Sequence, residues 1–220
     1  MTAERPVTSP RAATAGTSIV PLARREVLRY ARHPLFLVGL VLLVVTEAIP
    51  DPSSVRTTYL LHVLMPAMFV GVFGIVVEYR LARDSDRLAG ISGSATVGLY
   101  RRTVALAVGL AVPLGVGLVW FAFAGHRYAT TTTPPDGLPF GPVGDLWAYG
   151  WMVSLGVISC VGGPVLGLVL ARWYPRRGVA VVAAVLLILA VMVMQGVIEP
   201  LRYVRVVMQF TWFGGPTGVP

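Results

Sequence analysis

The sequence predicts an all-α membrane protein, a polytopic helical bundle built as a single transmembrane domain from residue 19 to residue 220. Its 220 residues are 55% apolar and only 13% charged. That is too little charge for a water-soluble domain of this size. The apolar residues gather in five long runs, most of which can cross a hydrocarbon layer about 30 Å thick as helix. We therefore expect spans at about 34–49, 59–77, 103–124, 147–170 and 179–198.

The distribution of arginine sets the expected orientation. Fourteen of the eighteen arginines lie before the first run, between the second and third, or between the fourth and fifth. The segments on the other side carry only Arg56, Arg127, Arg202 and Arg205. Because arginine-rich loops remain in the cytoplasm, we expect a multi-pass plasma-membrane protein with a cytoplasmic N-terminus. Arginines at membrane edges contact anionic lipid headgroups, so the net charge of +8 indicates lipids as partners, and no nucleic acid.

Two flanking segments have their own patterns. Residues 1–18 are rich in Thr, Ala, Ser and Pro and are expected to be a disordered cytoplasmic tail. Residues 19–33 place apolar side chains on one side of a helix and arginines with Glu26 on the other. This pattern predicts an amphipathic helix in the inner headgroup layer, ended by Pro34. The alternative is a first span that begins early. Residues 201–213 combine aromatics with two arginines, which predicts an outer interfacial or re-entrant segment.

Two internal patterns concern packing and partners. Gly163 and Gly167 form a small-xxx-small pair that lets helices approach closely, and packing within the chain is the simpler interpretation. The link 78–102 is the most polar internal segment. Charges spaced i,i+3 and i,i+4, such as Arg80 with Asp84, predict that span two continues as a charged helix to about Leu88. The link is either a partner-binding segment or a solvated connector.

Catalytic chemistry is not expected of this chain. Without a single lysine it cannot contain the phosphate loop GxxxxGK[ST], so we expect any ATP hydrolysis on another protein. The three histidines lie in separate segments and Cys160 stands alone, so no catalytic, cofactor or metal site is predicted. The span interiors carry no ionisable group, because Glu47, Glu78 and Glu199 are all expected at span ends.

Two segments resemble type-2 ABC exporter permeases. Residues 22–34, LARREVLRYARHP, resemble the elbow helix that opens these permeases, and residues 78–90, EYRLARDSDRLAG, are similar to the segment that contains their coupling helix. The resemblance implies a permease half that pairs with a second copy or close relative and with separate ATP-binding cassette ATPase subunits, which carry the ATP and Mg. Implied ATPase contacts are Arg83, Asp84, Asp86, Arg87 and Leu88, and implied elbow residues are Arg25, Glu26, Arg29 and Tyr30.

The resemblance further implies export of a lipid, a polysaccharide or an amphiphilic drug-like substrate across a bacterial plasma membrane. The family has six spans with both termini inside, so we expect a sixth span in addition to the five visible here, missing beyond Pro220. Two alternatives remain open. The chain is a non-transporting scaffold or assembly subunit of a membrane complex, or it is an ion-coupled transporter. The second alternative ranks last because the span interiors are expected to lack ionisable groups.

Overall fold

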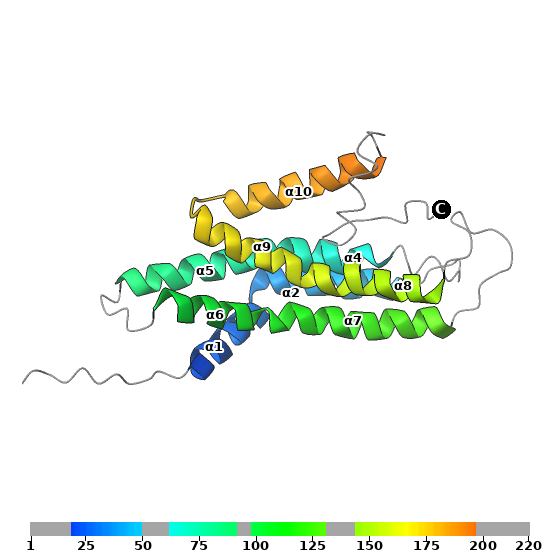
Figure 1. The fold of residues 1–220 in the computed structure, drawn as a ribbon, viewed down its shortest axis with the longest axis horizontal. Coiled ribbons are helices and arrows are strands. Elements are labelled where there is room, and N and C mark those ends of the chain that lie inside the picture. The colour runs from blue at the N-terminus through cyan, green and yellow to red at the C-terminus, as the bar shows by residue number, and fades with distance from the viewer. Residues whose placement is uncertain (1–18, 50–61, 92–97, 131–143, 197–220) are drawn as a thin grey trace, which may run out of the picture.

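The structure, a computed structural model, describes residues 19–49, 62–91, 98–130 and 144–196, and within these ranges the regular structure is entirely helical. The predicted tail 1–18 and the segment 201–213 lie outside the described residues. Figure 1 shows a bundle of long helices that run roughly parallel to one another, with α10 inclined away from the rest. The predicted all-helical fold is confirmed for the described part of the chain.

The first two helices are joined by a sharp bend. Helix α1 (Ile19–Ala31) meets α2 (Pro34–Ala48) at 55°. Pro34 begins α2, where its missing N–H leaves no hydrogen bond unmade. His33 caps the helix, because its Nδ1 accepts a hydrogen bond of 3.2 Å from the backbone N–H of Leu35. The predicted break at Pro34 is therefore confirmed.

The second long helix is continuous from α4 (Leu64–Pro66) through the π-helical turn η1 (Ala67–Val72) to α5 (Phe73–Ile91). Pro66 cannot donate to the preceding turn, and the π-helical turn follows it directly. The charged continuation of span two is confirmed, and it extends three residues beyond the predicted Leu88. The sequence AGISGS at residues 89–94 predicts a turn after this helix. That prediction is wrong for residues 89–91, which are still helical, and residues 92–94 lie outside the described residues.

Three further helical stretches complete the bundle. Helices α6 (Leu99–Gly109) and α7 (Ala111–Thr130) follow one another with an interruption at Leu110, three residues before Pro113. Helix α8 (Asp145–Trp151), the π-helical turn η2 (Met152–Ile158) and α9 (Ser159–Trp173) form another continuous helix. Helix α10 (Val179–Gly196) comes last. We call the end of the bundle where α5 and α9 stop and α6 and α10 start the arginine end; it lies at the left of Figure 1.

Three of these helices are long and apolar enough to cross a membrane: Leu64–Leu88, Leu99–Thr130 and Ala148–Trp173. The bent pair α1–α2 adds a fourth if the two helices form one span. By itself α2 is 15 residues, about 22 Å at 1.5 Å per residue, which is short for a crossing. Helix α10 has 18 residues, about 27 Å, so it comes closer to the length of a crossing. The number of five spans therefore stays a prediction, whereas the membrane class agrees with the many exposed apolar side chains on α2, α7 and α10.

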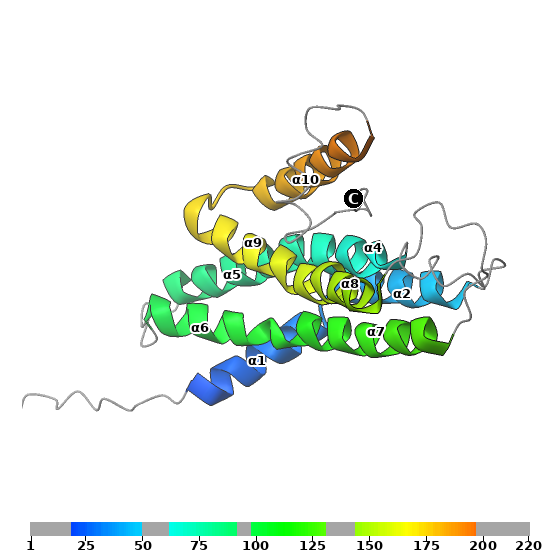
Figure 2. The ribbon, with the colours of Figure 1, turned by 45° about the vertical axis from the view of Figure 1, so that its right-hand side comes forward.

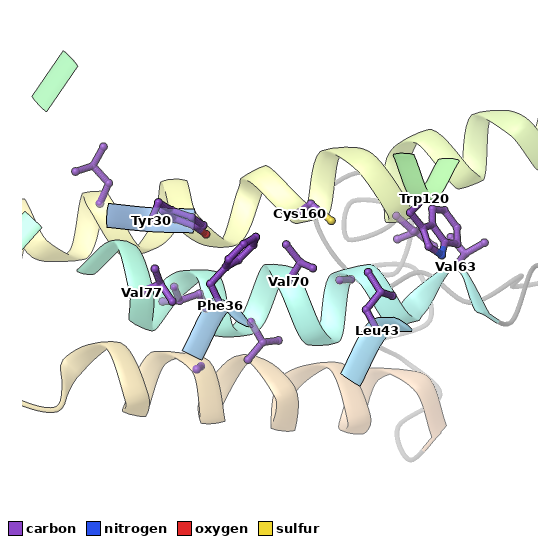
Figure 3. Close-up of a cluster of buried hydrophobic side chains, with 14 of the residues drawn as sticks. Tyr30, Phe36, Leu43, Val63, Val70, Val77, Trp120 and Cys160 are labelled. Carbon is purple, nitrogen blue, oxygen red and sulfur yellow. The ribbon is translucent and has the colours of Figure 1, made fainter. Parts of the chain in front are cut away.

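Glycines bring the central helices together. A Cβ atom built on Gly163 would lie 1.9 Å from the carbonyl oxygen of Gly71, and one on Gly167 would lie 2.3 Å from that of Ile75. Helix α9 thus touches η1 at Gly71 and α5 at Ile75, backbone to backbone, which confirms the predicted small-xxx-small pair and its packing within the chain. Figures 2 and 3 show this pair at the centre of the bundle, with buried side chains filling the space around it.

Candidate functional site

The charged residues of the arginine end are organised around one carboxylate. The Arg172 Nη1 of α9 donates to both carboxylate oxygens of Asp86, at 2.8 Å each. The Nη1 of Arg102 on α6 lies 3.5 Å from the same carboxylate and donates to the Ser85 carbonyl at 3.3 Å. We call Asp86, Arg102 and Arg172 the Asp86 hub. All three side chains are partly buried, so the hub ties α5, α6 and α9 together where screening by water is reduced.

The neighbouring implied ATPase contacts are placed differently. Asp84, Arg87 and Leu88 have exposed side chains, and Arg83 is half-buried. Asp84 and Arg87 form only a long, exposed ion pair of 3.9 Å one turn apart. Such a pair contributes little to stability. The structure therefore engages Asp86 inside the chain and presents Asp84, Arg87 and Leu88 outward; their contact with an ATPase stays a prediction.

Helix α1 shows one difference from its predicted faces. Glu26 was predicted on the polar side with Arg25 and Arg29, and this is wrong, because Glu26 is buried while Arg25 is exposed. The reason is a partner: Arg29 Nη1 donates to both Glu26 carboxylate oxygens, at 2.9 and 3.0 Å. The Arg29 guanidinium compensates the charge of the buried Glu26 carboxylate. Glu26 lies in the interface between α1 and α6, where Gly109 packs against its backbone.

Tyr30 is the anchor of α1. Its side chain is fully buried, and its ring packs edge-on against Phe36, with centroids 5.2 Å apart. Figure 3 shows Tyr30 and Phe36 turned toward the space between α5 and α9. A Cβ built on Gly74 of α5 would lie 2.5 Å from the Pro164 ring and 3.0 Å from the Tyr30 hydroxyl. Tyr30 therefore fixes α1 to the glycine-lined junction of α5 and α9.

Glu78 is the residue that sequence reasoning missed. It was predicted at a span end, yet only 1% of it is exposed, and neither carboxylate oxygen has a hydrogen-bond partner among the described residues. Three charged residues act on the Glu78 carboxylate: Glu26 repels its negative charge, and Arg172 and Arg29 attract it. A signal was available in the sequence: Glu78 shares the helical face of Gly71, Ile75 and Ala82, all of which are buried. A buried carboxylate in a membrane helix indicates a functional site.

The opposite end of the bundle holds a second polar contact. The Trp120 indole N–H donates to a Glu47 carboxylate oxygen at 2.8 Å, and His62 Nδ1 lies 3.5 Å from the other oxygen. The Trp120 ring packs on Gly156, where a Cβ would lie 2.2 Å from it. Beside this contact runs an apolar cleft of about 690 Å³ between α2 and α7. The contact joins α2, α7 and the start of the second long helix.

No metal site is formed in the described part of the chain, because no three His, Cys, Asp or Glu side chains come together there. Cys160 is buried and unpaired, as its apolar surroundings in the sequence predict. Comparison with protein-family models, with curated proteins and with solved structures finds no match for this chain. The arginine end, with the Asp86 hub, the buried Glu78 and the outward-facing end of α5, is therefore the candidate functional site on its geometry alone.

Proposed function

We propose that this chain is the permease subunit of an ATP-driven exporter of the ABC type, which moves a lipid, a polysaccharide or an amphiphilic drug-like substrate across a bacterial plasma membrane. A separate ATP-binding subunit at the arginine end supplies the energy. A second copy of the chain, or a close relative, completes the pathway. In this arrangement the N-terminus and the arginine end are cytoplasmic, in accord with the distribution of arginine.

The observation that carries the proposal is the charged end of α5. This helix runs without interruption from the packed bundle to Ile91, and its last turns present Asp84, Arg87 and Leu88 to the outside. The Asp86 hub joins the same turns to α6 and α9. A displacement imposed on the end of α5 would therefore reach α9 both through the hub and through the glycine contacts deeper in the bundle. A partner that changes shape on binding ATP needs such a rigid connection.

Helix α1 supports the same proposal. It is short and amphipathic, bends by 55° from α2, and lies at the arginine end with exposed Arg24 and Arg25. Those features suit an elbow helix in the headgroup layer, with Arg25 toward lipid headgroups and with Glu26, Arg29 and Tyr30 fixing the helix to the bundle. We further propose five spans in the given sequence and a sixth in the complete permease; the residues after Gly196 lie outside the described part.

The test is purification of the chain in mild detergent from its native membrane, followed by identification of co-purifying proteins. We expect an ATP-binding protein with a lysine-bearing phosphate loop. Exchange of charges in Arg83→Glu/Asp84→Arg should release it, whereas the matched exchange Arg127→Glu/Asp145→Arg at the opposite end should not. Both variants keep the net charge of +8. Recovery that the first exchange leaves unchanged, or recovery of no ATP-binding protein, favours the scaffold.

Glu78 favours a second candidate function, an ion-coupled transporter. Its buried carboxylate lies where a proton could be bound and released during a transport cycle. The purified chain in liposomes that enclose a pH-sensitive dye gives a direct test. Proton movement by the chain alone, lost in Glu78→Gln, would support this candidate. If liposomes that contain the chain keep a pH gradient for as long as protein-free liposomes do, the ion-coupled transporter is excluded.

A further inference from the structure

A polar cleft of about 550 Å³ lies at the arginine end, between α5 and the link that joins α9 to α10. Its rim carries Arg80, Arg83 and Arg87 from α5 and Arg176 and Arg177 from the link, and we call it the five-arginine cleft. The volume falls in the range of about 300–1,000 Å³ that is common for small-molecule sites. The sequence separates the two arginine groups by almost ninety residues, so only the fold brings them together.

The positive charge of this cleft is not neutralised within the described part of the chain. Asp84 is the one carboxylate in its lining, and it lies 3.9 Å from Arg87. The nearby Asp86 is already held by Arg172 and Arg102. Arg80, Arg83, Arg176 and Arg177 have no ion pair to any described residue. Arg80, Arg87, Arg176 and Arg177 are exposed and Arg83 is half-buried, so water screens part of their mutual repulsion. An anion in the cavity would relieve the remainder.

His33 adds no compensating or additional charge. It lies in the lining, and burial followed by the nearby Arg80 lowers its pKa from the usual value for histidine. The neutral ring agrees with its Nδ1 accepting the Leu35 N–H, since a protonated imidazole has no acceptor. The cleft thus holds five positive charges against one negative charge at neutral pH.

The cleft is held open by specific contacts. The Tyr79 hydroxyl, on a buried side chain of α5, lies 3.1 Å from the Tyr174 carbonyl oxygen and also within hydrogen-bond reach of that of Arg176. It thereby fixes the link against α5. Gly178 then turns the chain into α10 with φ of +86°, a conformation that other residues rarely adopt. The backbone that carries the two link arginines is therefore held against α5.

We infer that the five-arginine cleft binds a phosphate-bearing anion, from either an anionic lipid headgroup or phosphate free in solution. Guanidinium groups match phosphate oxygens in geometry and charge, and arginine pairs bind them with two parallel hydrogen bonds. Basic pockets between membrane helices on the cytoplasmic side bind such headgroups. Arg83 and Arg87 are shared with the proposed ATPase contacts, whereas Arg80, Arg176 and Arg177 lie outside them. Substitution of the two link arginines therefore tests the inference separately from the proposed function.

The experiment measures ligand binding to the full chain purified in an uncharged detergent. The three probes are short-chain phosphatidylglycerol, phosphatidylcholine with the same acyl chains, and inorganic phosphate. Each probe is titrated into the protein, and its binding is followed by thermal unfolding and by native mass spectrometry. We expect phosphatidylglycerol to bind at least tenfold more tightly than phosphatidylcholine. Added salt should weaken this binding. Competition by inorganic phosphate at low millimolar concentration would assign the site to free phosphate, and its absence to the lipid headgroup.

Two matched variants connect the binding to the cleft. Arg176→Gln/Arg177→Gln should weaken phosphatidylglycerol binding about tenfold or more, and Arg101→Gln/Arg127→Gln, which removes two arginines outside the cleft, should leave it within twofold. Equal binding of the two lipids by the unaltered chain would overturn the inference without any variant. It would also be overturned if both double variants weakened binding equally, or if the cleft variant lost a co-purifying protein and no lipid.

Discussion

Alanine at position 163 should separate the two central helices. A Cβ at this position would lie 1.9 Å from the Gly71 carbonyl oxygen, whereas Cβ atoms keep at least 3.0 Å from their neighbours. The difference of 1.1 Å has to be taken up by two helical backbones, neither of which can turn away as a side chain can. Overpacking of this kind costs about 1–3 kcal/mol or more. Alanine returns up to about 1 kcal/mol through its higher helix propensity.

The expected result is a loss of about 2 kcal/mol in the free energy of unfolding, measured by titrating the protein in mixed micelles with a denaturing detergent. Gly115→Ala in α7 is the control, because a Cβ there meets no atom within 4 Å. We expect Gly115→Ala to be neutral or slightly stabilising. If Gly163→Ala is as stable as Gly115→Ala, then η1 and α9 do not touch through their backbones, and the rigid connection on which the proposed function depends is refuted.

Three further substitutions test the polar contacts by the same unfolding measurement. Asp86→Asn should cost about 1–3 kcal/mol, because it leaves Arg172 without its carboxylate, and Asp84→Asn should cost under about 0.5 kcal/mol; equal effects would contradict the hub. Tyr30→Phe should be neutral or stabilising, since the buried hydroxyl has no partner among the described residues. Tyr30→Ala should cost about 3–5 kcal/mol, because it removes the whole buried ring. A large loss of stability in Tyr30→Phe would reveal a hydrogen-bond partner of the hydroxyl. Trp120→Phe should cost about 2–3 kcal/mol and Glu47→Gln, which keeps an acceptor, under about 1 kcal/mol; the reverse order would disprove the indole–carboxylate bond.

The helical class and the break at Pro34 could be predicted because they depend on local patterns. Runs of apolar residues, proline at the start of a helix and glycines four apart act within a few turns of chain. The continuation of span two was visible for the same reason, in the spacing of Arg80 and Asp84. The number of spans does not follow from local patterns in the same way. Helix α2 has 15 residues and follows a 55° bend, so it forms a span either by itself or together with α1.

The organisation of the arginine end could not be predicted, because it joins residues far apart in the sequence. Asp86 and Arg172 are 86 residues apart, and Tyr79 and Arg176 are 97 residues apart. A charge pattern shows that a residue is polar but not which partner accompanies it into the interior. Glu26 shows this most clearly, since on a helical wheel it belongs with the arginines, yet it is buried with its carboxylate bonded to Arg29.

The most direct test of the proposed function is to ask which protein touches the end of α5 in the native membrane. A photoreactive amino acid is placed at Leu88, which is exposed at the arginine end. The control carries the same amino acid at Leu118, which is exposed on the apolar helix α7. Irradiation should join position 88, and not position 118, to an ATP-binding protein. If position 88 is joined only to lipid, or to proteins that bind no nucleotide, the chain is not driven by an ATPase at this surface.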